Sequence, residues 1–214
     1  LMPTGNIHGK VIGLCSMMDE SACPWHGDWY RKAIVRCGIN EKEHFRLYYH
    51  DNSIHDDRAG YLDDPQHQVD YLGTLHQALL DVAAWCEKGI EPFDTMHYTY
   101  ADGQITLPKT AKERGGMQPV VSAVVENAAG QSDHDGKVTT AKAGQKVHFS
   151  ALIEVPPKAG KVTHAAWDYE KTNDWSKDEI VESVDDCTYK VETDHVFTEP
   201  GIYYPVIKVA SNRH

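Results

Sequence analysis

Hydrophobic and polar positions follow two different periods along this chain, and the change comes near residue 98. Before it, apolar runs of strand length alternate with segments whose apolar residues recur every three to four positions. Residues 11–15 and 43–50 are nearly continuous apolar or aromatic runs, which predict buried strands. Residues 26–38, between them, end in Gly38 and predict a short helix.

A long amphipathic helix is predicted over residues 66–88, after a polar loop at 51–65. Gly89 is placed to end it. We expect Trp85 to belong to the core, not to a cofactor site. The apolar stripe expected to face the core consists of Val69, Leu72, Leu75, Leu79, Val82, Ala83 and Cys86. The order strand, helix, strand, loop, helix is typical of an α/β domain with a parallel sheet.

From residue 98 onward, short apolar segments alternate with turn residues, which indicates an all-β sandwich. The pair Asp102-Gly103 predicts a two-residue hairpin turn. Further strands are predicted at residues 118–125, 146–155, 162–169, 188–197 and 202–210. We place the domain boundary near residues 112–119 and predict two domains, residues 1–114 and residues 115–214.

The composition excludes some classes of partner. With 41% hydrophobic and 25% charged residues, the chain has the make-up of a globular protein. Its formal net charge of −11 and its scattered lysines argue against nucleic acid, because a phosphate backbone attracts clustered Lys and Arg. No apolar run approaches the length of a membrane span, and no signal-peptide pattern is visible.

Two polar side chains follow the two predicted parallel strands. Asp19, with Glu20 beside it, comes after the first strand, and His55 comes after the second. Functional groups gather at the carboxyl ends of parallel strands, so we expect Asp19 and His55 to be neighbours. An acid followed along the chain by a histidine is the order of the last two members of a Ser–Asp–His triad. There the histidine takes the serine proton and the carboxylate orients the imidazole.

Four segments of the first domain carry a more specific pattern: GKVIGLCSMMDESACPW (9–25), IHDD (54–57), QALLDVAAWCEKGIEP (77–92) and LPKTAKERGGMQPVV (107–121). Together they resemble the C-terminal end of α/β hydrolases of the tannase and feruloyl esterase type. The resemblance implies that residues 1–114 are the C-terminal half of an α/β-hydrolase fold, with Asp19 as triad acid and His55 as triad base. Glu20 is the weaker candidate for the acid. The implied substrate is an ester of a small molecule or a plant polymer.

The nucleophile of such an enzyme is not found in this chain. No Gly-x-Ser-x-Gly motif occurs in it. Because the nucleophile elbow precedes the acid along the chain in this family, we expect it upstream of Leu1, in an N-terminal part of the hydrolase. The chain alone then supplies only the acid and the histidine, and we expect it to be inactive.

Two segments of the second domain also match a known pattern. Trp167-Asp168-Tyr169 lies within residues 143–171, and Pro200-Gly201-Ile202-Tyr203 lies within residues 195–211. They resemble a PKD-type immunoglobulin-like domain, which implies an immunoglobulin-like sandwich with Trp167 in its core. Such domains are mostly spacers or adhesive modules of extracellular proteins, so the resemblance favours a secreted or periplasmic protein.

The same residues allow other interpretations. Asp19 is also an ordinary turn residue, and a loop histidine is usually solvated. If Asp19 and His55 have only these structural roles, the chain is a non-catalytic adhesive or carbohydrate-binding protein. If they are catalytic, the enzyme could equally be a peptidase or another acyl hydrolase. Trp25, after the acidic turn, and Trp175, in a polar loop, are the candidate substrate-binding residues, because an exposed tryptophan stacks on a sugar or ring.

No cofactor is expected. The acidic segment 56–64 offers the carboxylates that calcium prefers, but it lacks the spacing of an EF-hand loop, and such runs are usually solvated. The five cysteines form no zinc-binding pattern. Cys15 and Cys23 flank the acidic turn and either form a disulfide or remain free thiols, so they leave the redox compartment open.

Overall fold

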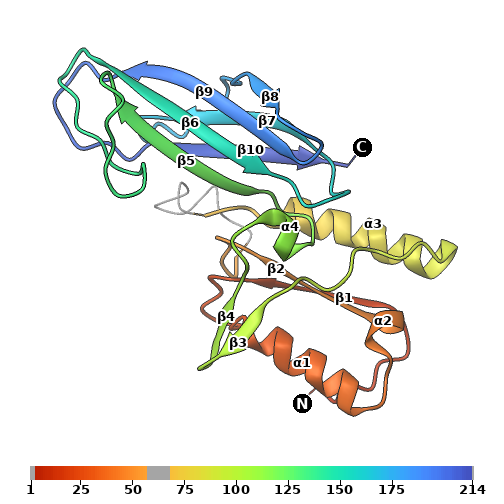
Figure 1. The fold of residues 1–214 in the computed structure, drawn as a ribbon. Helices are drawn as coiled ribbons and strands as arrows, with labels where there is room; N and C mark the ends of the chain where they lie inside the picture. Colours follow the sequence, from red (N-terminus) through yellow and green to blue (C-terminus); the bar gives the residue numbers. More distant parts are fainter. Residues whose placement is uncertain (1–2, 57–67, 214) are drawn as a thin grey trace. The chain divides into compact units, whose positions relative to one another are not determined.

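The computed structural model describes residues 3–56 and 68–213, and the chain forms two compact units (Figure 1). The first unit is Leu1–Gln118 and the second is Pro119–His214. The division follows Gln118, within the segment 112–119 in which the domain boundary is predicted. Each unit has its own core.

The first unit is built around a parallel pair of strands. β1 (Val11–Ser16) pairs with β2 (Phe45–His50) in a continuous register that ends with Ser16 opposite His50. Every residue of β2 is buried, as its aromatic and apolar run predicts. Between the strands come the helix α1 (Trp25–Arg36), which confirms the predicted short helix, and the short helix α2 (Glu41–His44). Strand β2 therefore begins two residues later than predicted.

Helix α3 (Leu72–Lys88) ends at Gly89, whose left-handed φ of 67° is open to glycine without strain. Its buried residues are Ala78, Asp81 and Trp85, so the predicted stripe is wrong at four exposed positions: Val69, Leu79, Ala83 and Cys86. The buried face of α3 is the one that carries Trp85, its largest buried side chain. The guanidinium of Arg46 lies 4.6 Å from the centroid of its ring, and this cation–π contact draws the Trp85 face toward β2.

The remainder of the first unit is a hairpin and a one-turn helix. β3 (Thr99–Ala101) and β4 (Gln104–Thr106) pair around Asp102 and Gly103, whose φ angles of 49° and 77° confirm the predicted hairpin turn. Helix α4 (Ala111–Arg114) follows, and the side chain of Thr110 caps its first turn by accepting from the N–H of Glu113.

The second unit is all-β in its described residues. Its strands are β5 (Val120–Asn127), β6 (Lys146–Glu154), β7 (Lys161–Asp168), β8 (Val181–Ser183), β9 (Thr188–Val196) and β10 (Val206–Asn212). They form an antiparallel sheet in the order β5-β6-β9-β8 and an antiparallel pair β7-β10. Phe149 of β6 and Trp167 of β7 meet with ring centroids 5.2 Å apart, and both are buried, which confirms the predicted core position of Trp167.

The prediction that residues 1–114 are half of an α/β-hydrolase fold was wrong. Among the described residues 32% are strand and only 18% are helix, arranged in small sheets. β1 and β2 are the only parallel pair in the part that the structure describes, and all other strand pairs there are antiparallel. A local strand–helix–strand signal is common to every βαβ unit. It does not establish the further parallel strands that an open hydrolase sheet requires.

Membrane insertion through a helix finds no support in residues 3–56 and 68–213. None of the helices described there has both the length and the apolar character that a bilayer crossing demands.

Candidate functional site

The pairing of β1 with β2 continues beyond the ends of both strands. The N–H of Met17 donates to the carbonyl of His50 at 2.9 Å, and the N–H of Met18 donates to the carbonyl of Ser53 at 2.8 Å. The next residue on the first loop is Asp19, and His55 lies two residues after Ser53. These backbone contacts bring the two loops together residue by residue at the carboxyl end of the parallel pair.

Asp19 is held by its own turn. Its Oδ1 accepts hydrogen bonds from the backbone N–H groups of Ser21 at 2.8 Å and Ala22 at 2.6 Å. This is the local bonding by which aspartate stabilises a turn. It also fixes the direction of the carboxylate.

The structure brings Asp19 and His55 into direct contact. Nδ1 of His55 lies 3.0 Å from Oδ2 and 3.1 Å from Oδ1 of Asp19. The Asp19 side chain is only 10% exposed, whereas the His55 side chain is 55% exposed. No described residue forms a hydrogen bond with Nε2 of His55.

The pKa values of both groups shift in the directions expected of an ion pair. Partial burial raises the pKa of Asp19, but the N–H of Ala22 and the imidazole of His55 outweigh it and hold this pKa below its ordinary value. The hydrogen bond to Asp19 and the charge of that carboxylate raise the pKa of His55 above its ordinary value. The nearby carboxylates of Glu20 and Asp56 add to this shift.

The geometry of the pair suits general acid–base chemistry. A carboxylate that accepts from Nδ1–H keeps the neutral imidazole in the tautomer whose Nε2 is basic. The same carboxylate stabilises the imidazolium once Nε2 has taken a proton. The pair is therefore able to remove a proton from a nucleophile and return it to a leaving group.

The pair does not line either of two hollows formed by described residues. One, of about 640 Å³, is lined by His97, Pro108, Thr110, Lys112 and Glu113. The other, of about 340 Å³, is lined by Asp28, Arg31, Lys32, Val35, Arg36 and Glu41. A substrate that reaches Nε2 of His55 therefore needs a binding surface beyond these hollows.

The two candidate substrate-binding tryptophans lie apart in the chain and in different units. Trp25 begins α1, is 37% exposed and packs its ring against His26, with centroids 4.0 Å apart. Trp175 belongs to the second unit, where its Nε1 donates to Asn173 at 2.8 Å. Nζ of Lys208 sits over its ring at 5.5 Å from the centroid, and Trp175 is half-buried, where an exposed ring was predicted.

The thiol of Cys15, next to the site, offers no nucleophile. Cys15 and Cys23 are both free, and burial together with the charge of Asp19 raises the pKa of Cys15 to about 11, which makes it unreactive. The candidate calcium segment 56–64 lies outside the described residues except for Asp56. Within the part of the chain that is described, no group of three His, Cys, Asp or Glu side chains is placed to hold a metal ion.

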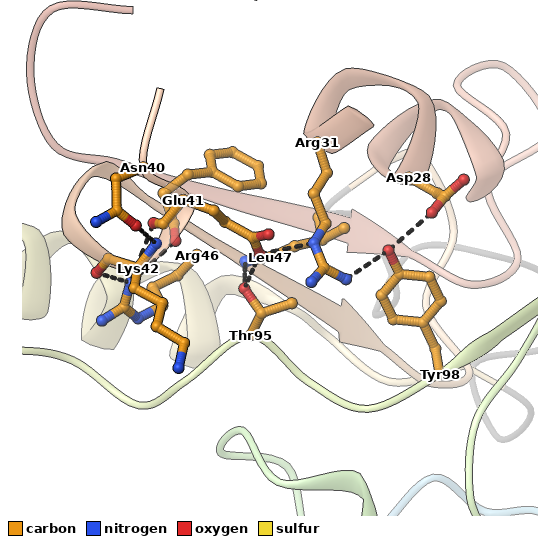
Figure 2. Close-up of polar contacts among 10 residues, drawn as sticks. Asp28, Arg31, Asn40, Glu41, Lys42, Arg46, Leu47, Thr95 and Tyr98 are labelled. Atoms are coloured by element: carbon orange, nitrogen blue, oxygen red, sulfur yellow. Dashed lines mark hydrogen bonds and ion pairs between the residues drawn. The ribbon is translucent and has the colours of Figure 1, made fainter. Parts of the chain in front are cut away.

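Figure 2 shows a second polar cluster, which sequence reasoning missed. The hydroxyl of Tyr98 donates to Oδ1 of Asp28 at 2.9 Å and accepts from Nη1 of Arg31 at 3.0 Å. Nε of Arg31 donates to Oε1 of Glu41 at 2.6 Å. Asp28 and Arg31 share a face of α1, which a helical pattern reveals, but their partner Tyr98 is 70 residues from Asp28. No spacing rule connects positions so far apart.

This cluster anchors α1 and α2 to β2. Thr95 donates to Glu41 at 3.2 Å, and its hydroxyl accepts from the N–H of Leu47 at 3.1 Å (Figure 2). Both acidic residues that line the adjoining hollow of about 340 Å³ form ion pairs. Lys32 lies 2.7 Å from Asp28, and Arg31 lies 2.6 Å from Glu41. The cluster therefore serves the packing of the first unit.

His50 is a further titratable group. The sequence places it at the end of the strand 43–50 but gives no sign that its ring is fully buried. It is 3% exposed, and its buried Nδ1 has no hydrogen-bond partner among the described residues. Burial lowers the pKa of His50 to about 4, against the opposing charges of Asp51 and Asp70. His50 is thus neutral at pH 7 while His55, five residues away, is the more basic group.

Comparisons with known protein families, with curated proteins and with solved structures found no match to this chain. The chemistry of the Asp19–His55 pair is therefore the basis on which a function is assigned.

Proposed function

We propose that Asp19 and His55 are the acid–base pair of an ester hydrolase whose serine nucleophile lies outside residues 1–214. The observation that carries the proposal is the 3.0 Å separation between Nδ1 of His55 and Oδ2 of Asp19. This is the contact that orients a catalytic histidine. The proposal concerns the chemistry of the pair and is independent of the α/β-hydrolase fold.

Two further observations support it. Nε2 of His55 has no hydrogen-bond partner among the described residues, and the side chain is 55% exposed, so a hydroxyl from another segment or chain is able to approach. No Gly-x-Ser-x-Gly motif occurs in residues 1–214, and no described serine forms a hydrogen bond with Nε2 of His55, so we expect the nucleophile on another segment or chain.

In the proposed reaction, Nε2 of His55 takes the proton of the serine hydroxyl as its oxygen attacks the ester carbonyl. Asp19 keeps the proton on Nδ1 and stabilises the imidazolium. His55 then gives its proton to the departing alcohol, which leaves an acyl-serine. Water, deprotonated by His55 in the same way, attacks this ester, and its collapse returns the proton to the serine and releases the acid.

The experiment uses the native gene product isolated from its source, assayed with p-nitrophenyl, galloyl and feruloyl esters and labelled with a fluorophosphonate. We expect one serine to be labelled, and we expect His55→Ala to lower kcat/KM by about 10³-fold or more. Asp19→Asn should lower it strongly as well, because the wrong tautomer is then favoured. His8→Ala, at an exposed histidine with no hydrogen bond to another described residue, is the matched control and should leave turnover unchanged.

The outcomes separate the proposal from its rivals. Ester turnover that survives His55→Ala, or a native protein in which no serine is labelled, overturns the hydrolase assignment. Turnover of peptide amides in preference to esters, still dependent on His55, moves the assignment to a peptidase.

A further inference from the structure

Asp51 is the first residue after β2 and lies four residues before His55, and all of its polar groups are bonded. Its N–H donates to Oε1 of Gln118 at 2.7 Å, and its carbonyl accepts from Nε2 of the same side chain at 3.0 Å. Its Oδ2 lies 2.8 Å from Nη1 of Arg114. Its Oδ1 accepts from the N–H of Asn52 at 3.1 Å.

The Gln118 amide pairs with Asp51 as a strand would, through one donor and one acceptor. Arg114 is itself fixed, because its Nε donates to the carbonyl of Pro108 at 2.5 Å. Asp51 is therefore clamped to a segment of the chain more than sixty positions away. We call the contacts of Asp51 with Gln118 and Arg114 the Asp51 clamp.

The chain between the clamp and His55 has little freedom. Asn52 has a left-handed φ of 54°, and its carbonyl accepts from the N–H of Val69 at 2.8 Å. Ser53 is fully buried, and its hydroxyl donates to the carbonyl of His50 at 2.9 Å. A displacement at Asp51 is therefore passed along a short, bonded segment to His55.

We propose that Asp51 is a positioning residue for His55, and that Gln118 and Arg114 act on the Asp19–His55 pair through it. The role of Asp51 in catalysis rests on the proposed function, because it acts on the same pair. The contacts that hold Asp51 do not depend on that function. Gln118 is also the last residue of the first unit, and Pro119 begins the connection to β5. The clamp thus ties the start of this connection to the loop that carries His55.

The test measures the ring titration of His55 by NMR in the full chain and in Gln118→Met, which keeps the length of the side chain and removes the amide. In the intact protein the His55 midpoint lies above about 6.5, held there by Asp19 with Glu20 and Asp56 nearby. We expect Gln118→Met to shift it downward toward about 6.5, because the ring then spends less time against Asp19. Gln104→Met, on an exposed strand position, is the matched control and should not move it.

Amide hydrogen exchange provides a second measurement on the same samples. The Asp51 N–H should exchange faster in Gln118→Met, because it has lost its acceptor. Faster exchange at Asp51 with an unmoved His55 midpoint overturns the proposal, since the clamp then serves only the fold. Unchanged exchange overturns it as well.

A conservative variant covers the case in which Gln118→Met does not fold. Arg114→Lys keeps the charge but loses the fork that reaches both Asp51 and Pro108, and it should lower the His55 midpoint by a smaller amount. An unmoved midpoint in a folded Arg114→Lys protein counts against the clamp. If the midpoint moves in these variants but His55→Ala keeps full ester turnover, the proposed function fails and the clamp stands.

Discussion

Nδ1 of His55 and Oδ2 of Asp19 lie 3.0 Å apart, although 36 residues separate the two positions in the chain. The contact exists because β1 and β2 are parallel and their backbone bonding runs on through Met17 and Met18. Each loop is thereby fixed before Asp19 or His55 is reached. The pair is a product of strand pairing and not of local sequence.

The first prediction concerns the source of the basicity of His55. Asp19→Asn removes the charge but keeps the shape, so we expect the His55 titration midpoint in NMR to fall toward about 6.5. Glu20→Gln removes a charge from the next residue without touching the hydrogen bond and should lower the midpoint by much less. Equal effects of the two substitutions would mean that general charge, and not the Asp19 contact, sets the pKa of His55.

The second prediction is a dependence of stability on pH that arises from His50. Its pKa is about 4 in the folded protein and about 6.5 when unfolded, so between these values the unfolded state binds more protons. Its contribution is complete above pH 6.5 and is lost as the pH falls toward 4, on the order of 3 kcal/mol in all. Urea unfolding between pH 7.5 and pH 4.5 measures it.

His50→Gln cannot titrate in this range, so its free energy of unfolding should change less with pH than that of the parent. The exposed His8→Gln is the matched control and should follow the parent. His55 contributes with the opposite sign: its raised pKa adds stability below pH 6.5 that is lost as the pH rises through its folded pKa. Parallel curves for the parent and His50→Gln would contradict the assigned role of His50.

The third prediction compares two helical glycines. A Cβ added at Gly27 in α1 would lie 2.7 Å from Sγ of Cys15 and 3.1 Å from Cδ1 of Leu47, so Gly27→Ala should destabilise the protein by about 1–3 kcal/mol. A Cβ at Gly73 in α3 meets nothing within 4 Å, so Gly73→Ala should stabilise it by up to about 1 kcal/mol. Chemical denaturation of both variants checks the signs.

A double variant identifies the cause. Cys15→Ala removes the sulfur that the new methyl group would meet, so Gly27→Ala should cost less in the Cys15→Ala background than in the parent protein. An unchanged cost in that background would assign the strain to another neighbour.

The fourth prediction tests the core of the second unit along a single strand. Phe149 of β6 is 2% exposed and contacts the ring of Trp167, whereas Leu152 on the same strand is 42% exposed. Phe149→Ala should cost about 3–5 kcal/mol in the free energy of unfolding, and Leu152→Ala less than about 1 kcal/mol. Thermal or urea unfolding that ranks the two substitutions in the opposite order would exclude this core.

Sequence patterns predicted the individual elements well where a strong local signal exists. The apolar run of β2, the glycine stop of α3 and the Asp-Gly turn between β3 and β4 all lie where the patterns place them. Patterns failed where a distant residue decided the outcome. The buried face of α3 follows Trp85 because Arg46 lies against its ring, and no periodicity of the helix contains that contact.

The fold class was wrong for a related reason. Two parallel strands with a helix between them look alike in sequence whether they stand in a small pair or in a large open sheet, since the difference is made by strands elsewhere in the chain. For the candidate site, the order of an acid and a histidine after successive strands was enough to name Asp19 and His55. It was not enough to find the Asp51 clamp.

The sequence by itself determined most of the longer elements, the change of period near residue 98 and the two side chains at the strand ends, because turn chemistry and apolar periodicity act over a few residues. It predicted neither the short elements α2, α4 and β8 nor the start of α3 at Leu72. The tertiary structure alone decided that Asp19 meets His55, that Gln118 pairs with Asp51, and that Tyr98 joins Asp28 to Arg31. These contacts join positions 36 to 70 residues apart. They form only when the free energy gained by packing the core offsets the entropy lost in closing such long loops.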